Sequence, residues 1–264
     1  MYSNNAMKVA PPPDKRSRLT RQTGAFNDFK GLFQGFTLAE VLITLGIIGV
    51  VAAMTMPVLI AKHREKVLVT KVKKSYSQLQ NALKMYAAQN ECSDISCISD
   101  TNQTSEQLAD KLFSQFQGGH RCTNKSGICK SISIKSNKPY YVDGKTATGD
   151  SFTPNFVSSN GTAYKVVQYS TCVRDATSPK RDEDGYIIYD ENGNPELSKY
   201  KLYYCALFYI DANGVENGPN QFGADIYRFD LNYNGKFVSY TDILPVLTKG
   251  KLEYTPYEIG KPKE

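Results

Sequence analysis

Cysteines are the side chains with the clearest chemistry in this sequence. The chain has six of them, and all follow residue 91: Cys92, Cys97, Cys122, Cys129, Cys172 and Cys205. An even number of cysteines confined to one side of a chain indicates disulfides formed in an oxidising compartment. A zinc site is the alternative, but no close pair has the two-residue spacing of a zinc knuckle, and His120 is the only imidazole nearby. From proximity along the chain and the expected hairpins, we expect the pairs Cys92–Cys97, Cys122–Cys129 and Cys172–Cys205.

Oxygen-bearing side chains gather in a second stretch, residues 211–225. It begins Asp-Ala-Asn-Gly-Val-Glu-Asn-Gly-Pro-Asn and ends at an aspartate. Calcium takes six to eight oxygen ligands, backbone carbonyls included, so Asp211, Asn213 and Asp225 are candidate calcium ligands. The glycine spacing does not fit an EF-hand. The alternative is a tight-turn loop stabilised by its own Asn and Asp side chains.

No group of residues in the sequence suggests catalysis. The two histidines, His63 and His120, are isolated, and no Gly-x-Ser-x-Gly motif, phosphate loop or His-rich metal motif is present. The net charge of +6 is concentrated before residue 91, and the rest of the chain is mildly acidic. The sequence therefore predicts a protein that is not an enzyme, has no catalytic residues and does not bind nucleic acid.

An apolar segment at residues 36–61 contains a single charge, Glu40. Its uncharged part, Val41–Ile60, has 20 residues, enough for a helix to cross a bilayer core of about 30 Å. A carboxylate near the membrane interior costs about 2.5–3.5 kcal/mol, so Glu40 needs a partner or an interfacial position. An ordinary signal peptide cut after Ala53 is the alternative. The long polar lead-in, the carboxylate and the apolar run beyond Ala53 all argue against it.

The sequence QGFTLAE at residues 34–40, followed by the apolar stretch, resembles the processing motif of type IV prepilins and type II secretion pseudopilins. The resemblance implies cleavage between Gly35 and Phe36 by a prepilin peptidase and methylation of Phe36. Glu40 matches the family's glutamate, which implies pairing with the free amine of a neighbouring subunit's Phe36. Pro57 matches a helix proline typical of the family. The resemblance covers about 55 residues, and the leader is longer than in many members.

The resemblance implies a structural subunit, a pseudopilin or minor pilin, of a type IV filament or type II secretion-like system. Such a subunit assembles through its N-terminal helix with other pilin subunits on an inner-membrane platform. The motif and the cysteines predict a cytoplasmic N-terminus, one inner-membrane span and an exported head, later part of a periplasmic or cell-surface filament. Basic residues flank both ends of the span, so the positive-inside rule does not decide its orientation. Some pseudopilins hold calcium in a loop similar to 211–225.

Two alternatives remain. One is an exported binding protein, such as an adhesin, held by an uncleaved signal anchor, and the other is an anchored enzyme. The sequence also leaves open whether the filament serves secretion, adhesion, motility or DNA uptake.

The elements that must position these residues are a long helix and a sheet. Apolar residues at spacings of three or four extend the helix to about Ala88: Leu68, Val72, Tyr76, Leu79, Leu83 and Tyr86. At Pro57 we expect a kink or local melting, or a helix that ends and restarts. A short helix at 105–116 is favoured by a capping box of Thr104 and Gln107.

Residues rich in Tyr, Ile, Val and Phe predict five strands: 131–134, 163–172, 186–189, 200–210 and 226–231. Five Asn-Gly pairs, at 160, 192, 213, 217 and 234, predict tight hairpin turns. The expected fold is α+β and pilin-like, with the long helix packed on an antiparallel sheet. Its parts are a removable leader (1–35) with about 25 disordered residues, a transmembrane helix (36–61), an amphipathic continuation (62–90) and a disulfide-containing head (91–264).

Overall fold

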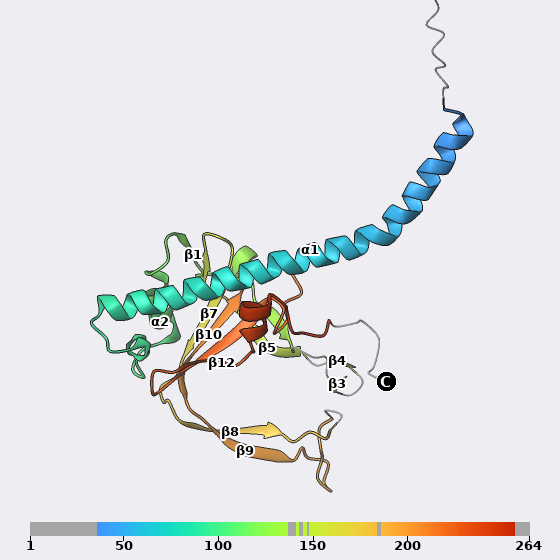
Figure 1. Cartoon of the computed structure of the whole chain (residues 1–264). Helices are drawn as coiled ribbons and strands as arrows, with labels where there is room; N and C mark the ends of the chain where they lie inside the picture. The colour runs from blue at the N-terminus through green and yellow to red at the C-terminus, as the bar shows by residue number, and fades with distance from the viewer. Residues whose placement is uncertain (1–35, 137–140, 143–144, 147, 184–185, 257–264) are drawn as a thin grey trace, which may run out of the picture. The chain divides into compact units, whose positions relative to one another are not determined.

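The computed structural model describes residues 36–136, 141–142, 145–146, 148–183 and 186–256 (Figure 1). The expected leader, with its disorder and the cleavage residue Gly35, lies outside these residues. The chain divides into two compact units, residues 1–52 and 53–264. Its secondary structure is α+β, with a long N-terminal helix and a C-terminal antiparallel sheet, as expected.

Helix α1 (Leu38–Gln89) has 52 residues and spans the expected membrane and amphipathic segments. The helix continues through Pro57, so the alternative that it ends there and restarts is wrong. A proline removes one backbone hydrogen bond, and the turns on either side still hold the helix together.

The second half of α1 lies across the six-stranded sheet (Figure 1). Val72, Leu79 and Leu83 are fully buried against it, while Leu68 and Tyr76 are half-buried at the edges of the stripe. Four smaller residues that the apolar pattern missed are also buried: Val69, Ser75, Ala82 and Ala87. Small side chains let the helix approach the sheet closely enough to exclude water.

A buried polar contact fixes this approach. The Ser75 and Thr162 hydroxyls lie 2.7 Å apart, and the Tyr164 hydroxyl donates to the Ser75 carbonyl at 3.3 Å. Burial raises the pKa of Tyr164, which keeps the phenol neutral.

The main sheet is antiparallel throughout, in the order β1-β6-β7-β10-β11-β12. Its strands are β1 (Gly119–Arg121), β6 (Phe156–Ser158), β7 (Ala163–Gln168), β10 (Tyr204–Asp211), β11 (Ile226–Asn232) and β12 (Phe237–Ser239). Every residue of the central strand β10 is buried. Phe208 and Ile210 belong to the core cluster under α1, and Leu207 and Tyr209 belong to a cluster on the opposite face. A strand covered on both faces is expected to be a nearly continuous apolar run, and β10 is one up to its last residue, Asp211.

The face of the sheet away from α1 is covered by a small ribbon of β2 (Ile132–Lys135) and β5 (Thr148–Phe152). Ile134 and Phe152 from this ribbon are fully buried against Leu207 and Tyr209. A further pair joins β3 (Tyr141–Val142) to β4 (Lys145–Thr146). The Cys122–Cys129 disulfide links β1 to the 3₁₀ helix η2 (Gly127–Cys129) before this ribbon begins.

Along the chain, α1 is followed by the 3₁₀ helix η1 (Ile95–Ile98) and helix α2 (Ser105–Phe113), and the first strand of the sheet comes after them. The Thr104–Gln107 capping box is present at the start of α2, which is three residues shorter than expected. The Cys92–Cys97 disulfide joins the end of α1 to η1. A turn of π-helix, η3 (Pro245–Lys249), was not expected from the sequence.

The segment between β7 and β10 differs most from the expected strands. It forms a separate two-stranded ribbon of β8 (Arg174–Pro179) and β9 (Leu197–Leu202), outside the main sheet (Figure 1). The expected strand 200–210 is therefore divided at Tyr203, and 186–189 contains only isolated bridges. The Cys172–Cys205 disulfide, also as expected, closes the base of this ribbon.

The Asn-Gly turns divide into two groups. Gly161, Gly193 and Gly235 adopt positive φ in short turns, as predicted for hairpins. The pairs at 213 and 217 instead lie in the 14-residue connection between β10 and β11, so the expectation of tight hairpins there is wrong.

The packing of α1 on the sheet leads to a stability prediction. We expect Leu83→Ala to lower the free energy of unfolding by about 2–5 kcal/mol, since it leaves a cavity at a fully buried site. Chemical denaturation of the detergent-solubilised chain, followed by circular dichroism, measures the change. Met85→Ala, at an exposed position of the same helix, is the control, and an equal loss in both variants would contradict the packing described.

Candidate functional site

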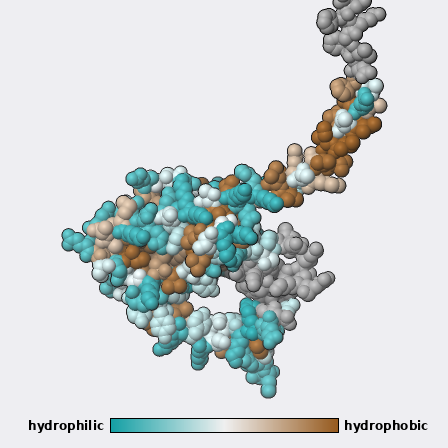
Figure 2. Space-filling view, viewed as in Figure 1, coloured by the Kyte–Doolittle hydropathy of each residue, from teal (hydrophilic) through white to brown (hydrophobic). Residues whose placement is uncertain are grey.

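The first candidate region is the start of α1. Large apolar side chains of residues 36–60 are exposed along the helix (Figure 2). Phe36 is 86% exposed, and no residue of 36–60 reaches the burial of the head's core. Among the described residues, α1 is the one helix long and apolar enough to cross a membrane, judged by length and composition. These side chains require a lipid or protein environment that the described chain does not supply.

Glu40 has a local role that sequence reasoning missed. Its carboxylate accepts hydrogen bonds of 2.8 Å from the Thr37 backbone N–H and from the Thr37 hydroxyl. The Glu40 N–H in turn donates to the Thr37 hydroxyl oxygen at 3.2 Å. This reciprocal arrangement is a capping box, and the Thr-x-x-Glu spacing is the signal that could have predicted it. Any test of Glu40 must therefore separate its charge from its cap.

The second candidate region is the connection between β10 and β11. Asp211 ends β10 and Asp225 directly precedes β11. The register pairs Asp211 with Ile226, and the Ala212 N–H donates to the Asp225 carbonyl at 2.9 Å. The antiparallel pairing therefore brings together two carboxylates that are 14 residues apart in sequence. Both aspartates are fully buried.

Backbone N–H groups donate to one oxygen of Asp211 and to both oxygens of Asp225. Asp211 Oδ1 accepts from Gly214 N–H at 3.0 Å, and the two Asp225 oxygens accept from Asn220 and Gln221 N–H at 2.9 and 2.8 Å. Three buried side-chain oxygens in the loop have no hydrogen-bond partner: Asp211 Oδ2, Asn213 Oδ1 and Asn220 Oδ1. Buried oxygens without donors are costly, so this loop offers a set of acceptors without the matching donors.

The pKa shifts of the two aspartates also indicate that this loop has too little positive charge and too few hydrogen-bond donors to offset their burial. Burial, and next the charge of Asp225, raises the pKa of Asp211 to about 8. Burial also raises the pKa of Asp225, although N–H donors from Gln221 and Asn220 oppose the shift. The positive charge of Lys71 on α1 partly offsets the shift at Asp211. Without a cation, Asp211 holds a proton at neutral pH.

The donor set fits a hard divalent cation. Among the described residues, no three His, Cys, Asp or Glu side chains gather as a metal site, so the loop would supply two carboxylates and otherwise amide and carbonyl oxygens. Calcium accepts amide and carbonyl oxygens beside carboxylates, and its flexible coordination suits a loop. Asp211, Asn213, Asp225 and Asn220 are the residues that would hold it. Asn220, which has positive φ, was missed as a ligand because only the folded loop shows its buried oxygen.

The other expected site residues are distributed over both units. Phe36 and Glu40 belong to the first unit, and Pro57 and the 211–225 loop belong to the second. The six cysteines form three disulfides with no free thiol among the described residues. No protein-family model, curated protein or solved structure matches the chain.

A pH-dependent calcium response follows from the buried carboxylates. An unfolded aspartate titrates near pH 4, so the raised pKa of Asp211 makes the calcium-free fold lose stability as pH rises from about 4 to about 8. Calcium requires the ionised carboxylate, so its stabilising effect should grow over the same interval. We expect millimolar calcium to raise Tm, relative to chelator, more at about pH 8 than at about pH 6. Magnesium should do less, because it demands tighter octahedral geometry.

Matched variants sharpen this test. Asp211→Asn keeps the side-chain volume and removes the charge, so it should lose the calcium response while remaining folded in chelator. Glu216→Gln removes an exposed carboxylate of the same loop and should keep the response. Equal Tm in chelator and calcium at both pH values would identify the loop as a turn alone.

Proposed function

We propose that this chain is a structural subunit of a type IV filament or type II secretion-like system, a pseudopilin or minor pilin. In this proposal the chain is cleaved after Gly35 and assembles through α1. The observation that carries the proposal is a helix of 52 residues whose first half is apolar and exposed and whose second half packs on an antiparallel head. The prepilin-type motif at residues 34–40 extends into the first turn of this helix, which begins at Leu38.

Glu40 favours a filament subunit over a simple anchor. An anchor needs only an apolar span, and a carboxylate within it is destabilising. In an assembled filament the same carboxylate can pair with the Phe36 amine that cleavage exposes on a neighbouring copy. The α1 apolar surface can then pass from lipid to the helices of neighbouring subunits without entering water.

The disulfides support the proposed location. Three disulfides are expected in an exported head and rare in the cytosol. With the single span, they favour a subunit whose head faces the periplasm and whose N-terminus starts in the cytoplasm. The proposed partners are a prepilin peptidase, other pilin subunits and the inner-membrane assembly platform.

The second candidate, an exported binding protein held by an uncleaved signal anchor, shares the span and the disulfides. The mature N-terminus separates the two. We expect mass spectrometry to find methylated Phe36 at the N-terminus of the membrane-bound protein. Gly35→Leu should leave the full-length precursor, because a bulky side chain obstructs the peptidase at that position. Replacement of the neighbouring Gln34 by Ala is the control and should leave processing intact; normal cleavage of Gly35→Leu would contradict the proposal.

Glu40 provides the assembly test, and the capping box provides its control. Glu40→Ala removes both charge and cap, whereas Glu40→Gln keeps a side chain that can complete the cap. We expect both variants to be cleaved and inserted, and both to give much less sheared filament than wild type on immunoblots. Wild-type filament yield from Glu40→Gln would restrict Glu40 to a capping role.

A further inference from the structure

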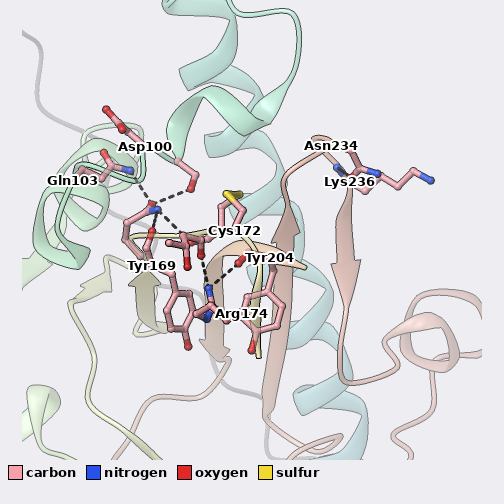
Figure 3. Close-up of a disulfide and its surroundings, with 12 residues drawn as sticks. Asp100, Gln103, Tyr169, Cys172, Arg174, Tyr204, Asn234 and Lys236 are labelled. Carbon is pink, nitrogen blue, oxygen red and sulfur yellow. Dashed lines mark hydrogen bonds between the residues drawn. A yellow bond between two sulfur atoms is a disulfide. The ribbon is translucent and has the colours of Figure 1, made fainter. Parts of the chain in front are cut away.

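The ribbon of β8 and β9, with its connecting residues 180–196, forms an arm that pairs with no other strand among the described residues. The Cys172–Cys205 disulfide closes its base (Figure 3). Beside the disulfide, the Arg174 guanidinium lies 3.4 Å from the Tyr169 ring centroid and 4.8 Å from that of Tyr204. Arg174 also donates to the carbonyls of Thr171 and Tyr204. The arm therefore leaves the head from a fixed base.

The described residues of the tip of the arm, 180–183 and 186–196, are joined by backbone hydrogen bonds, and most of their side chains are exposed. Ile188 N–H donates to the Lys180 carbonyl at 3.0 Å, and Glu196 N–H donates to the Ile188 carbonyl at 2.9 Å. Tyr186 and Tyr189 are each about half exposed. Exposed aromatic side chains on a rigid ribbon are typical of interaction surfaces.

The tip is strongly acidic. Residues 180–196 contain six carboxylates against Lys180 and Arg181, and carboxylates lie on either side of the exposed tyrosines in the sequence. Glu183 and Glu191 are exposed and have no ion pair with described residues, whereas Glu196 pairs with Lys180 at 2.8 Å. The tip thus presents free carboxylates beside apolar rings.

A complementary surface lies on α1. Residues 62–74 contain six cations and one carboxylate, and no ion pair holds these cations among the described residues. Between this part of α1 and the 211–225 loop lies a groove of about 600 Å³. Arg64 and Lys71 line it from the helix, together with the apolar side chains of Val67 and Leu68. The helix side of the groove thus combines positive charge with apolar surface, whereas the tip combines negative charge with aromatic side chains. Glu216 lines the groove from the loop side.

We propose that the acidic tip of one subunit docks in the basic groove of a second copy. Carboxylates of the tip then meet Arg64 and Lys71, and the tip's exposed tyrosines meet Val67 and Leu68. Opposite charge on the two faces aligns the copies and disfavours other registers. This inference rests on the proposed function, since a filament holds many copies side by side and presents tips and grooves in equal number.

The test is site-specific photo-crosslinking of the full-length chain in assembled filaments. With the photoreactive residue p-benzoylphenylalanine at Tyr189, irradiation should give a product of twice the subunit mass. Peptide mass spectrometry should place the new bond within residues 62–71 of the second copy. The same residue at Tyr233, an exposed position in the turn between β11 and β12, is the control and should not label this segment.

Charge reversal adds an independent readout. Glu183→Lys with Glu191→Lys should lower the crosslink yield about tenfold, because like charges then face one another. Arg64→Glu, which reverses a cation that lines the groove, should restore at least part of the yield when combined with the reversed tip. Lys71 is left unchanged because its charge also acts on Asp211.

The outcomes separate the inference from the proposed function. Absence of filaments from the wild-type chain overturns the proposed function itself. Filaments whose crosslink lies within one chain, on lipid, or outside residues 62–71 leave the proposed function standing and overturn the docking of the tip. A crosslink to the groove that charge reversal leaves unchanged overturns the electrostatic match.

Discussion

The apolar surface of residues 36–60 must leave water, and nothing in the described chain covers it. Burying a side chain such as Leu, Ile or Phe is worth about 1.5–3 kcal/mol, so a surface of this length cannot remain in solvent. Both halves of α1 carry apolar surface that must be removed from water, and they differ in what covers it. Its second half is covered by the head, through small and large side chains that alternate against the sheet. Its first half requires lipid or other helices, which the described chain does not provide.

In the head, strand β10 is likewise apolar surface that other elements must cover. Because β10 is covered by α1 on one face and by the β2–β5 ribbon on the other, all of its residues are buried, including the terminal Asp211. The connection that follows must return to the antiparallel neighbour β11, and this return places Asp225 beside Asp211. Two adjacent buried carboxylates destabilise the fold less when one of them is protonated or when a cation binds beside them. The pairing of these two carboxylates in the loop is therefore a consequence of where the central strands end.

The arm shows how disulfides extend a small head beyond its core. An isolated two-stranded ribbon is marginally stable in water. The Cys172–Cys205 bridge closes a loop of 33 residues, which in the chain-entropy model contributes about 3–4 kcal/mol. The stacked Arg174 adds a packed base, so the ribbon can present apolar and acidic side chains without a sheet beneath them. The other two bridges close short loops where α1 ends and where the β2–β5 ribbon begins.

The sequence alone determined the features that depend on a few neighbouring residues, namely the long helix and several turns. The uninterrupted apolar run and the stripe of Leu79 and Leu83 predicted a long helix, and turn chemistry placed Gly161 and Gly235 correctly, because helix periodicity and positive φ are properties of a few neighbouring residues. Proximity along the chain predicted Cys92–Cys97 and Cys122–Cys129, and the expected hairpin pairing predicted Cys172–Cys205. Tertiary structure decided the rest: the division of the expected strand at Tyr203, the burial of Ser75 and Ala82, and the orphaned oxygen of Asn220. Each of these depends on which distant segment lies opposite, and a pattern of neighbouring residues carries no information about what faces it across a sheet.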